Sequence, residues 1–480
     1  MGVVSRGFGR SALATRTALV MQILFDRGTL LLENPASRRL VDALPGVLYD
    51  PRVECHRAPA WRYQEIVGAL RQQGIAFSDA VLPQAIASGK RVRNWQPVEL
   101  RPYQQAALLA WGMAGHRGVL VLPTGSGKTR VACAAMAATG ARTLCLVPTR
   151  ALLHQWRAEL TRHYSGPVGC FGDGERKLES VSVTTFESAF RRMPRIGNRF
   201  DLLVVDEAHH FGCGMRDEAL EMCVAPLRLG LTATPAGDET SERVTELIGP
   251  VVYELTINDL KGRWLADFDL VVLRLRLHPD ERRRYDAEIG AFRKVYRDFR
   301  AMSPGASWQE FVAAASQSAE GRSALAAWRQ ARKLLAFPRS KRETLGSLLE
   351  RHRNSRVLVF TTDNESAYEI GREHLIMPIT CDITRREREQ ALEWFRRGAL
   401  RQLVSARVLN EGVDVPDADV GVVVGGALGE REHVQRVGRL LRPRQGKRAL
   451  VYELVTVATT ETRQSAKRRR QLAIARAPGV

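Results

Sequence analysis

Short runs of apolar residues recur along this chain, and most are followed by longer stretches with helical spacing. Two regions show this alternation, residues 96–255 and residues 346–458. In the first region helices are expected to begin at about Lys128, Arg150 and Arg216. The runs that predict strands are 118–122, 143–147, 181–184, 202–205 and 227–231 in the first region, and 356–361, 403–406, 420–425 and 449–454 in the second. Alternating strands and helices predict a parallel sheet covered on both faces, so the expected fold class is α/β with two such lobes.

A smaller unit is expected before the first lobe, in residues 21–95. Two strand-like runs, 23–25 and 29–32, flank Asp26-Arg27-Gly28, which predicts a hairpin with a glycine turn. Residues 63–72 follow with helical spacing. We therefore expect a small α+β N-terminal domain without a catalytic cluster.

The region between the two lobes, residues 256–345, breaks the strand–helix alternation. Residues 279–300 and 307–335 have helical spacing and many charges, including Arg282-Arg283-Arg284. The sequence predicts a helical insertion here. Its basic face either contacts nucleic acid or is an ordinary solvated face, and the pattern does not choose between them.

The two ends of the chain differ from the rest. Residues 1–20 contain Arg and Ser but no acidic residue, which superficially suits an organelle transit peptide. Because a strand-like run opens at Met21, we favour Met21 as the natural start, with a disordered extension before it. Residues 459–480 form a basic tail with Lys467-Arg468-Arg469-Arg470, which would add to backbone binding.

Composition narrows the class of partner. The chain has 480 residues, a formal net charge of +20 and a pI near 10.2, which favours a polyanionic partner, with nucleic acid ahead of a membrane surface. Its seven cysteines form no C-x-x-C pair, so a zinc finger or iron–sulfur site is not expected, and an unpatterned odd set suits reduced thiols in a cytosol. No apolar run reaches the length of a membrane span. We expect a cytoplasmic protein.

A glycine-rich loop follows the first strand of the first lobe. It reads Leu122-Pro123-Thr124-Gly125-Ser126-Gly127-Lys128-Thr129, between an apolar run and an Ala-rich helix. Strand, glycine loop and helix form the context of a phosphate-binding loop, because backbone N–H groups and the helix N-terminus can surround phosphate oxygens. Lys128 would reach the β and γ phosphates of ATP, and the Thr129 hydroxyl would bind Mg²⁺. One departure is Leu122, where the full pattern has glycine.

Two adjacent carboxylates end a later strand. The run Leu202-Leu203-Val204-Val205-Asp206-Glu207 delivers both to the carboxyl edge of a parallel sheet, where ligands bind in open α/β folds. Asp206 would hold Mg²⁺, directly or through water. Glu207 would orient and deprotonate the attacking water. Together with the loop, these residues predict an ATP-hydrolysing site.

From residue 96 onward these motifs resemble those of the superfamily 2 helicases, whose two lobes are RecA-like. The resemblance implies ATP as the nucleotide, Mg²⁺ as its metal and a nucleic-acid strand as the track. In the first lobe it implies that Gln104 contacts adenine, that Thr149, Arg150 and Thr185 contact strand phosphates, and that Thr232-Ala233-Thr234 couples hydrolysis to strand movement. In the second lobe it implies a catalytic role for Gln435, Arg439 and Arg442, and nucleotide contacts from Gly412 and Asp414. The two Arg side chains would reach the γ-phosphoryl group only when the lobes close.

Within that superfamily the chain is most similar to the XPB branch. The run Asp206-Glu207-Ala208-His209-His210 and the domain order carry this resemblance. It implies a division into an extension (1–20), a damage-recognition-like domain (21–95), an ATP-binding lobe (96–255), a thumb-like insertion (256–345), a second lobe (346–458) and a tail (459–480). It further implies a DNA-dependent ATPase and helicase of 3′ to 5′ polarity in nucleotide excision repair, acting on single-stranded or forked DNA, with a separate nuclease as a partner.

One position departs from the XPB pattern. The family carries an Arg-Glu-Asp triplet just after Thr-Ala-Thr, and here Gly237 stands where the Arg would fall. This loss of a cation weakens the expectation of strand separation more than that of ATP hydrolysis or translocation. Two alternatives therefore stay open: an ATP-driven duplex translocase subunit of a restriction or phage-defence complex, and an ATP-gated nucleic-acid-binding scaffold. RNA is the least favoured substrate, although backbone contacts to RNA and DNA are alike.

Overall fold

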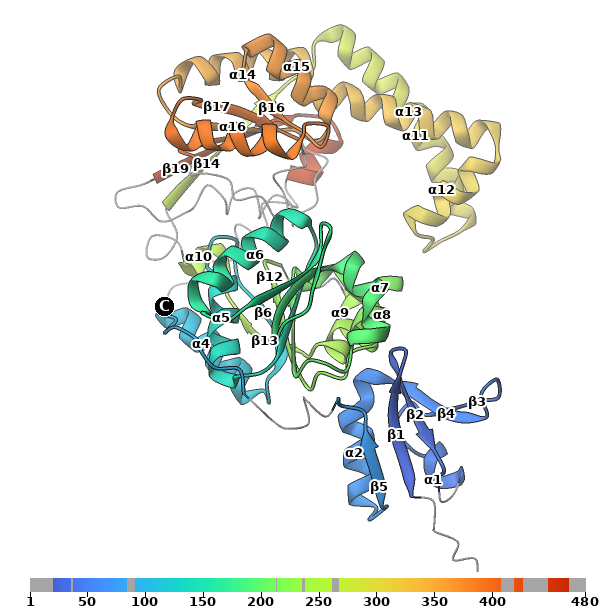
Figure 1. Ribbon diagram of the computed structural model, residues 1–480. Coiled ribbons are helices and arrows are strands. Elements are labelled where there is room, and N and C mark those ends of the chain that lie inside the picture. Colours follow the sequence, from blue (N-terminus) through green and yellow to red (C-terminus); the bar gives the residue numbers. More distant parts are fainter. Residues whose placement is uncertain are drawn as a thin grey trace, which may run out of the picture.

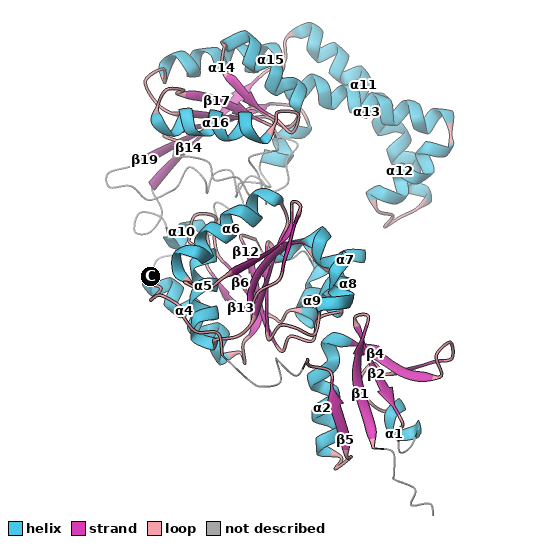
Figure 2. Ribbon diagram, in the orientation of Figure 1, coloured by secondary structure: helices cyan, strands magenta, loops and turns pink. Residues whose placement is uncertain are grey.

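Three sheets follow one another along the chain and form the N-terminal domain, lobe 1 and lobe 2 of the computed structural model (Figure 1). The structure describes residues 20–35, 38–83, 91–212, 214–234, 238–260, 267–406, 418–425 and 448–465. Figure 2 shows that helices flank the sheets of both lobes, while a separate group of helices extends from lobe 2. No helix of the described residues is long and apolar enough to cross a membrane.

The N-terminal domain is a small α+β unit. Its strands have the order β3-β4-β2-β1-β5, and β1 (Met21–Asp26) pairs with β2 (Thr29–Glu33) around a turn in which Arg27 and Gly28 have positive φ angles. The predicted hairpin is therefore confirmed, and so is the predicted helix, α2 (Tyr63–Gln72). The remaining elements are α1 (Arg38–Asp42), β3 (Leu48–Asp50), β4 (Cys55–Pro59) and β5 (Phe77–Ala80).

This domain is bonded to lobe 1. The Asn198 side chain donates to the Val81 carbonyl at 2.8 Å, and Arg62 pairs with Glu246 at 3.2 Å. Trp61 is buried in the core of lobe 1, whereas Val224 of lobe 1 is buried in the N-terminal core. Each unit thus completes the core of the other.

Lobe 1 contains a sheet of the order β13-β6-β12-β11-β7-β10-β8-β9 among the described residues. All neighbours are parallel except the β8–β9 hairpin. The strands are β6 (Arg117–Val121), β7 (Thr143–Val147), β8 (Val168–Gly172), β9 (Glu175–Lys177), β10 (Val181–Thr185), β11 (Leu202–Asp206), β12 (Leu227–Thr232) and β13 (Val251–Glu254). The helices are α4 (Pro102–Met113), α5 (Lys128–Thr139), α6 (Arg150–His163), α7 (Phe186–Ile196), α8 (Glu218–Glu221), α9 (Asp238–Leu247) and α10 (Ile257–Leu260).

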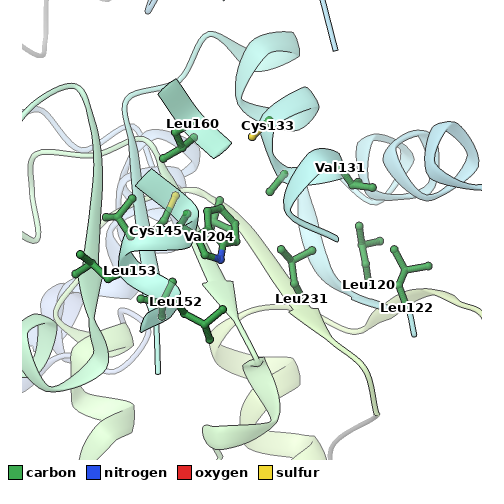
Figure 3. Close-up of a cluster of buried hydrophobic side chains, with 14 of the residues drawn as sticks. Leu120, Leu122, Val131, Cys133, Cys145, Leu152, Leu153, Leu160, Val204 and Leu231 are labelled. Carbon is green, nitrogen blue, oxygen red and sulfur yellow. The ribbon is translucent and has the colours of Figure 1, made fainter. Parts of the chain in front are cut away.

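Alternate residues of the lobe 1 strands enter two cores. Leu120 on β6 packs with α4, α5 and α6 on one face, and its neighbours Val119 and Val121 pack with α7, α8 and α9 on the other. Figure 3 shows Leu152, Leu153 and Leu160 of α6 gathered against Cys145 and Val204 of the sheet. Burial on both faces explains why these strands read as continuous apolar runs in the sequence.

Lobe 2 contains a parallel sheet of the order β14-β19-β18-β15-β17-β16. Its strands are β14 (Asp267–Leu275), β15 (Val357–Phe360), β16 (Met377–Ile379), β17 (Gln402–Ser405), β18 (Val420–Val423) and β19 (Arg448–Thr456). Helices α14 (Arg339–Arg351) and α15 (Asn364–His374) contribute Leu345 and Ile370 to the core on one face, and α16 (Arg385–Arg397) contributes Phe395 to the core on the other. The predicted α/β class with two parallel-sheet lobes is confirmed.

The helical insertion is shorter than the predicted range 256–345. Strand β14 pairs along its whole length with β19, so residues 267–275 belong to the lobe 2 sheet. Sequence reading missed this because the partner strand lies far along the chain and no helix of the alternating pattern links them. We call the remaining helices the arm: α11 (Pro279–Met302), α12 (Trp308–Gln317) and α13 (Ala319–Ala336).

A buried ion pair of lobe 2 lies at the base of the arm. Lys341 Nζ lies 2.7 Å from Glu461 Oε1, with exposed side-chain fractions of 0% and 4%. The same ammonium donates to the Leu335 carbonyl, at the end of α13, and Glu461 Oε2 accepts from the Thr456 backbone N–H. Tyr285 of α11 accepts a hydrogen bond from the Thr460 backbone N–H at 3.1 Å. Both long helices of the arm are thereby bonded to the end of the lobe 2 sheet.

Candidate ATP and nucleic-acid site

Three neighbouring strands of lobe 1 end in the predicted nucleotide motifs. The sheet order places β12 between β6 and β11. The glycine loop follows β6, the Thr232-Ala233-Thr234 segment follows β12, and Asp206 ends β11. Because all three strands are parallel, their carboxyl ends lie on one edge of the sheet. Segments about a hundred residues apart in the chain thus meet at that edge.

The glycine loop is held in shape by residues of α4. Gly125 and Gly127 have φ angles of +83° and +81°, a region that side chains disfavour. The Ser126 carbonyl accepts two hydrogen bonds at 2.7 Å, from the Tyr103 hydroxyl and from the Gln104 amide. A Cβ at Gly127 would lie 2.6 Å from that amide nitrogen. The loop therefore depends on glycine for its backbone angle and for space.

The side chains of this loop fit a phosphate group. Within the described residues, Thr124 Oγ1 and Ser126 Oγ are buried and have no hydrogen-bond partner. Lys128 Nζ donates to the Leu122 carbonyl at 3.2 Å, and Lys128 lies at the first position of α5 with Thr129 next to it. Unpaired hydroxyls, an ammonium and a helix N-terminus are what phosphate oxygens require.

Asp206 is buried and held from two sides. Its Oδ1 accepts the Glu207 backbone N–H at 3.0 Å, and its Oδ2 accepts the Trp156 indole N–H at 2.7 Å. Burial raises the pKa of the Asp206 carboxyl, and the Lys128 charge and the indole hydrogen bond oppose that shift. The Asp206 carboxylate and the Thr129 hydroxyl are both oxygen ligands of the kind that Mg²⁺ prefers, so the chemistry of these residues fits this metal.

Glu207 is linked through His209 to Thr232, the last residue of β12. Its backbone is left-handed, with φ 50° and ψ 50°. His209 Nδ1 lies 3.4 Å from the Glu207 carboxylate and 2.9 Å from Thr232 Oγ1, and that hydroxyl donates to the Thr234 carbonyl at 2.7 Å. A chain of polar contacts thus joins the predicted water-activating carboxylate to the predicted coupling motif.

The predicted strand contacts of lobe 1 lie at two helix N-termini. Thr149 caps α6 by accepting the Leu152 N–H, and Thr185 caps α7 by accepting the Ser188 N–H, both at 3.3 Å. Their strands, β7 and β10, are neighbours, so the two helix ends open on the same sheet edge. The Arg150 side chain is 74% exposed and lies 3.3 Å from Asp173. Exposed N–H groups and a cation at two adjacent helix ends suit phosphate binding.

The predicted lobe 2 site residues lie outside the described residues. These are Gly412, Asp414, Gln435, Arg439 and Arg442, and the same holds for Gly237 of lobe 1. Their roles stay predictions. So do the extension and most of the basic tail, because residues 1–19 and 466–480 are not described.

Sequence reading missed two residues of the lobe 1 site. Trp156 lies within an amphipathic helix, where an apolar side chain indicates core packing, and nothing local signals its bond to Asp206. His209 follows the paired carboxylates directly, so its position was a usable signal. Only the structure shows that it contacts both Glu207 and Thr232.

Comparisons with known proteins match the three parts of the chain that the structure separates. Three family models match: the type III restriction enzyme res subunit over residues 97–237, the xeroderma pigmentosum group B helicase damage recognition domain over residues 23–81, and the helicase conserved C-terminal domain over residues 340–444. They correspond in turn to lobe 1, the N-terminal domain and lobe 2.

Two curated relatives cover most of the chain. The DNA 3′-5′ translocase XPB2 of Sulfurisphaera tokodaii is 35% identical over 435 residues, which are 88% of this chain and 96% of the relative. The DNA 3′-5′ helicase XPB of Mycobacterium tuberculosis is 28% identical over 482 residues, 97% of this chain and 80% of the relative.

Proposed function

Because the chain belongs to the XPB family of superfamily 2 helicases, a family of ATP-using enzymes that act on DNA, we propose that it is a DNA-dependent ATPase that moves 3′ to 5′ along DNA. The polarity is the one in the names of both relatives. The observation that supports the proposal most is the convergence of the glycine loop, Asp206 and Thr232 on one sheet edge beside two helix N-termini.

The proposed ATP site assigns one task to each group. The loop from Thr124 to Thr129 binds the phosphates, with Lys128 on the β and γ groups. Asp206 and Thr129 hold Mg²⁺, which when bound neutralises charge on the phosphates. Glu207 accepts a proton from the attacking water. Gln104 keeps the loop closed through Ser126 and, by resemblance, recognises adenine.

Lobe 2 completes the proposed site when the lobes close. By resemblance, Arg439 and Arg442 would place positive charge on the γ-phosphoryl transition state, Gln435 would share their catalytic role, and Gly412 and Asp414 would contact the nucleotide. Hydrolysis removes the γ-phosphoryl contact that joins the two lobes, so the lobes open. Phosphate contacts at Thr149, Arg150 and Thr185 then alternate with those of lobe 2, which moves the protein along a strand independently of base sequence.

ATP turnover by the purified chain tests this proposal. It is measured without nucleic acid and with single-stranded DNA, blunt duplex, forked DNA and single-stranded RNA. Strong stimulation by single-stranded or forked DNA is expected. Stimulation by RNA alone would contradict a DNA-dependent motor, and stimulation by none of the four nucleic acids would favour the ATP-gated scaffold.

A duplex translocase is the second candidate, and a specific observation supports it. The model that matches lobe 1 describes a restriction-enzyme subunit, and the relative from S. tokodaii is named a translocase. Displacement of a third strand from a triplex, without separation of a forked duplex, would favour translocation without unwinding. Separation of the fork would favour the helicase.

The cellular setting forms part of the proposal. We place the chain in the cytoplasm, where thiols such as Cys133 and Cys145 stay reduced. The damage-recognition model matched by the N-terminal domain supports a role in nucleotide excision repair, with a separate nuclease as a partner. Affinity capture of the tagged chain, before and after DNA damage, tests both.

A further inference from the structure

Helix α6 belongs to both of the sites proposed above. Its N-terminus carries Thr149 and Arg150, the proposed contacts to the DNA backbone. Less than two turns further along, its inner face carries Trp156, which bonds to the proposed metal-binding carboxylate of Asp206. The two sites therefore share one rigid element.

The bond between Trp156 and Asp206 is short and enclosed. The indole nitrogen lies 2.7 Å from Oδ2, and the exposed fractions are 0% for Trp156 and 5% for Asp206. The indole is part of the core that also contains Leu153 of α6 and Val204 of the sheet, both labelled in Figure 3. A packed indole has one direction in which to donate, so it fixes the orientation of the carboxylate.

The opposite face of α6 is held by ion pairs to the β8–β9 hairpin. Asp173, in the hairpin turn, lies 3.3 Å from Arg150 and 2.9 Å from His154. Arg157 pairs with Glu175 of β9 at 2.6 Å. A DNA phosphate at the α6 N-terminus would compete with Asp173 for Arg150. Strand binding thus changes the restraint on the helix that carries the indole.

We propose that Trp156 is a positioning residue that links strand binding at the α6 N-terminus to the orientation of Asp206, and that DNA stimulates ATP hydrolysis through this link. The inference rests on the proposed function, since it needs both sites named there. The indole acts through Asp206 and touches neither ATP nor DNA.

The chain offers a matched control for this residue. Trp111 is 1% exposed, belongs to the same core of lobe 1, and donates its indole N–H at 2.9 Å to the backbone carbonyl of Arg228. Trp156→Phe and Trp111→Phe therefore remove the same N–H and the same ring volume from one core. Only the first substitution releases a carboxylate at the ATP site.

The first test is steady-state ATP turnover with and without single-stranded DNA. Partners that orient metal-binding groups are worth roughly 10- to 100-fold in activity, so Trp156→Phe should lower the DNA-stimulated kcat by that factor. The Kd for DNA and the KM for ATP should change little, and Trp111→Phe should keep the stimulation ratio of the wild type. Equal ratios in the two variants would overturn the inference and leave the proposed function standing. A wild-type chain that DNA does not stimulate would overturn both.

The second test observes the hydrogen bond without turnover. In protein labelled with ¹⁵N at the indoles, the Trp156 resonance is the one absent from Trp156→Phe. If that variant does not fold, Trp→Phe variants at the other seven of the eight tryptophans identify the signal by elimination. Single-stranded DNA without nucleotide should shift this resonance and leave that of Trp111 in place, and Arg150→Ala should reduce the shift. An unmoved Trp156 signal in DNA-saturated wild-type protein would overturn the inference.

Discussion

Both lobes contain parallel strands that lead into helices, but β6 of lobe 1 and β15 of lobe 2 enter their helices differently. In lobe 1, β6 leads through glycines to the N-terminus of α5, where Gly127 occupies the cap position and two buried hydroxyls lack partners. In lobe 2, β15 leads to α15, whose cap is Asp363. The first turn is open to an anion in one lobe and already holds a carboxylate in the other.

The contacts of Asp363 show how the second turn is closed. Its Oδ1 accepts the Ser366 N–H at 2.8 Å, and its Oδ2 accepts the hydroxyls of Ser366 at 3.1 Å and Thr362 at 2.8 Å. A carboxylate here satisfies the helix N–H groups that phosphate oxygens would otherwise bind. The turn after β15 therefore already holds the Asp363 carboxylate, whereas the loop after β6 presents buried hydroxyls that have no partner among the described residues.

Removing the Lys128 ammonium should have the largest effect on the difference between the two lobes. Lys128→Ala should abolish ATP hydrolysis, because it removes the ammonium group that contacts the β and γ phosphates. The circular dichroism spectrum should stay that of the wild type. Lys333→Ala is the control in the arm beside lobe 2, where the ammonium pairs with Glu365 at 2.7 Å and is 62% exposed. Turnover that persists in Lys128→Ala would refute the phosphate-loop assignment.

The proposed contribution of lobe 2 to hydrolysis should be separable from nucleotide binding. Arg439→Ala should slow hydrolysis by roughly 10³-fold, the effect of losing an arginine finger, with ATP affinity nearly unchanged. Rapid-quench turnover and fluorescent-nucleotide titration measure the two quantities. Arg353→Ala, on the exposed surface of lobe 2, is the control. An unaltered rate would refute the arginine-finger role of Arg439.

One added methyl group, in Gly127→Ala, tests whether the loop requires glycine. Gly127→Ala should weaken ATP binding about tenfold, because a left-handed non-glycine residue costs roughly 1–3 kcal/mol and the Cβ meets Gln104. Gly398 of lobe 2 has a similar φ angle, +79°, but no atom within 4 Å of its added Cβ. Isothermal titration should show normal ATP affinity for Gly398→Ala. Equal affinities in both variants would mean that the loop has room to adjust.

The smallest effect is expected from replacing Asp363, the residue that caps α15 in lobe 2. Asp363→Ala should lower the free energy of unfolding by about 1 kcal/mol, the usual cost of a lost cap, and leave ATP binding at one site per chain. Thr384→Ala, which removes the cap of α16, should cost a similar amount in chemical unfolding. A second bound nucleotide in Asp363→Ala would show that one carboxylate alone keeps lobe 2 from binding phosphate.

Much of this architecture could be predicted from short local patterns. The strands of lobe 1 are buried on both faces, so each appears as an apolar run, and the strand Thr143–Val147 matches its expected bounds. Strand β14 could not be placed, because its partner lies far along the chain and pairing between distant strands leaves no local signal. The cap at Asp363 is a visible helix-start signal, whereas the bond from Trp156 to Asp206 joins residues that only the folded sheet brings together.

The length of the arm and the bonds at its base determine how far its free end would move. Helix α11 has 24 residues and is therefore about 36 Å long, and its base is bonded to the end of the lobe 2 sheet. A lobe rotation of about 10° would carry the far end of such a lever by ~6 Å, roughly two nucleotide rises in a stacked strand. If lobe 2 rotates in the proposed cycle, an arm of this length would carry its far end over a distance comparable to the nucleotide spacing of the strand.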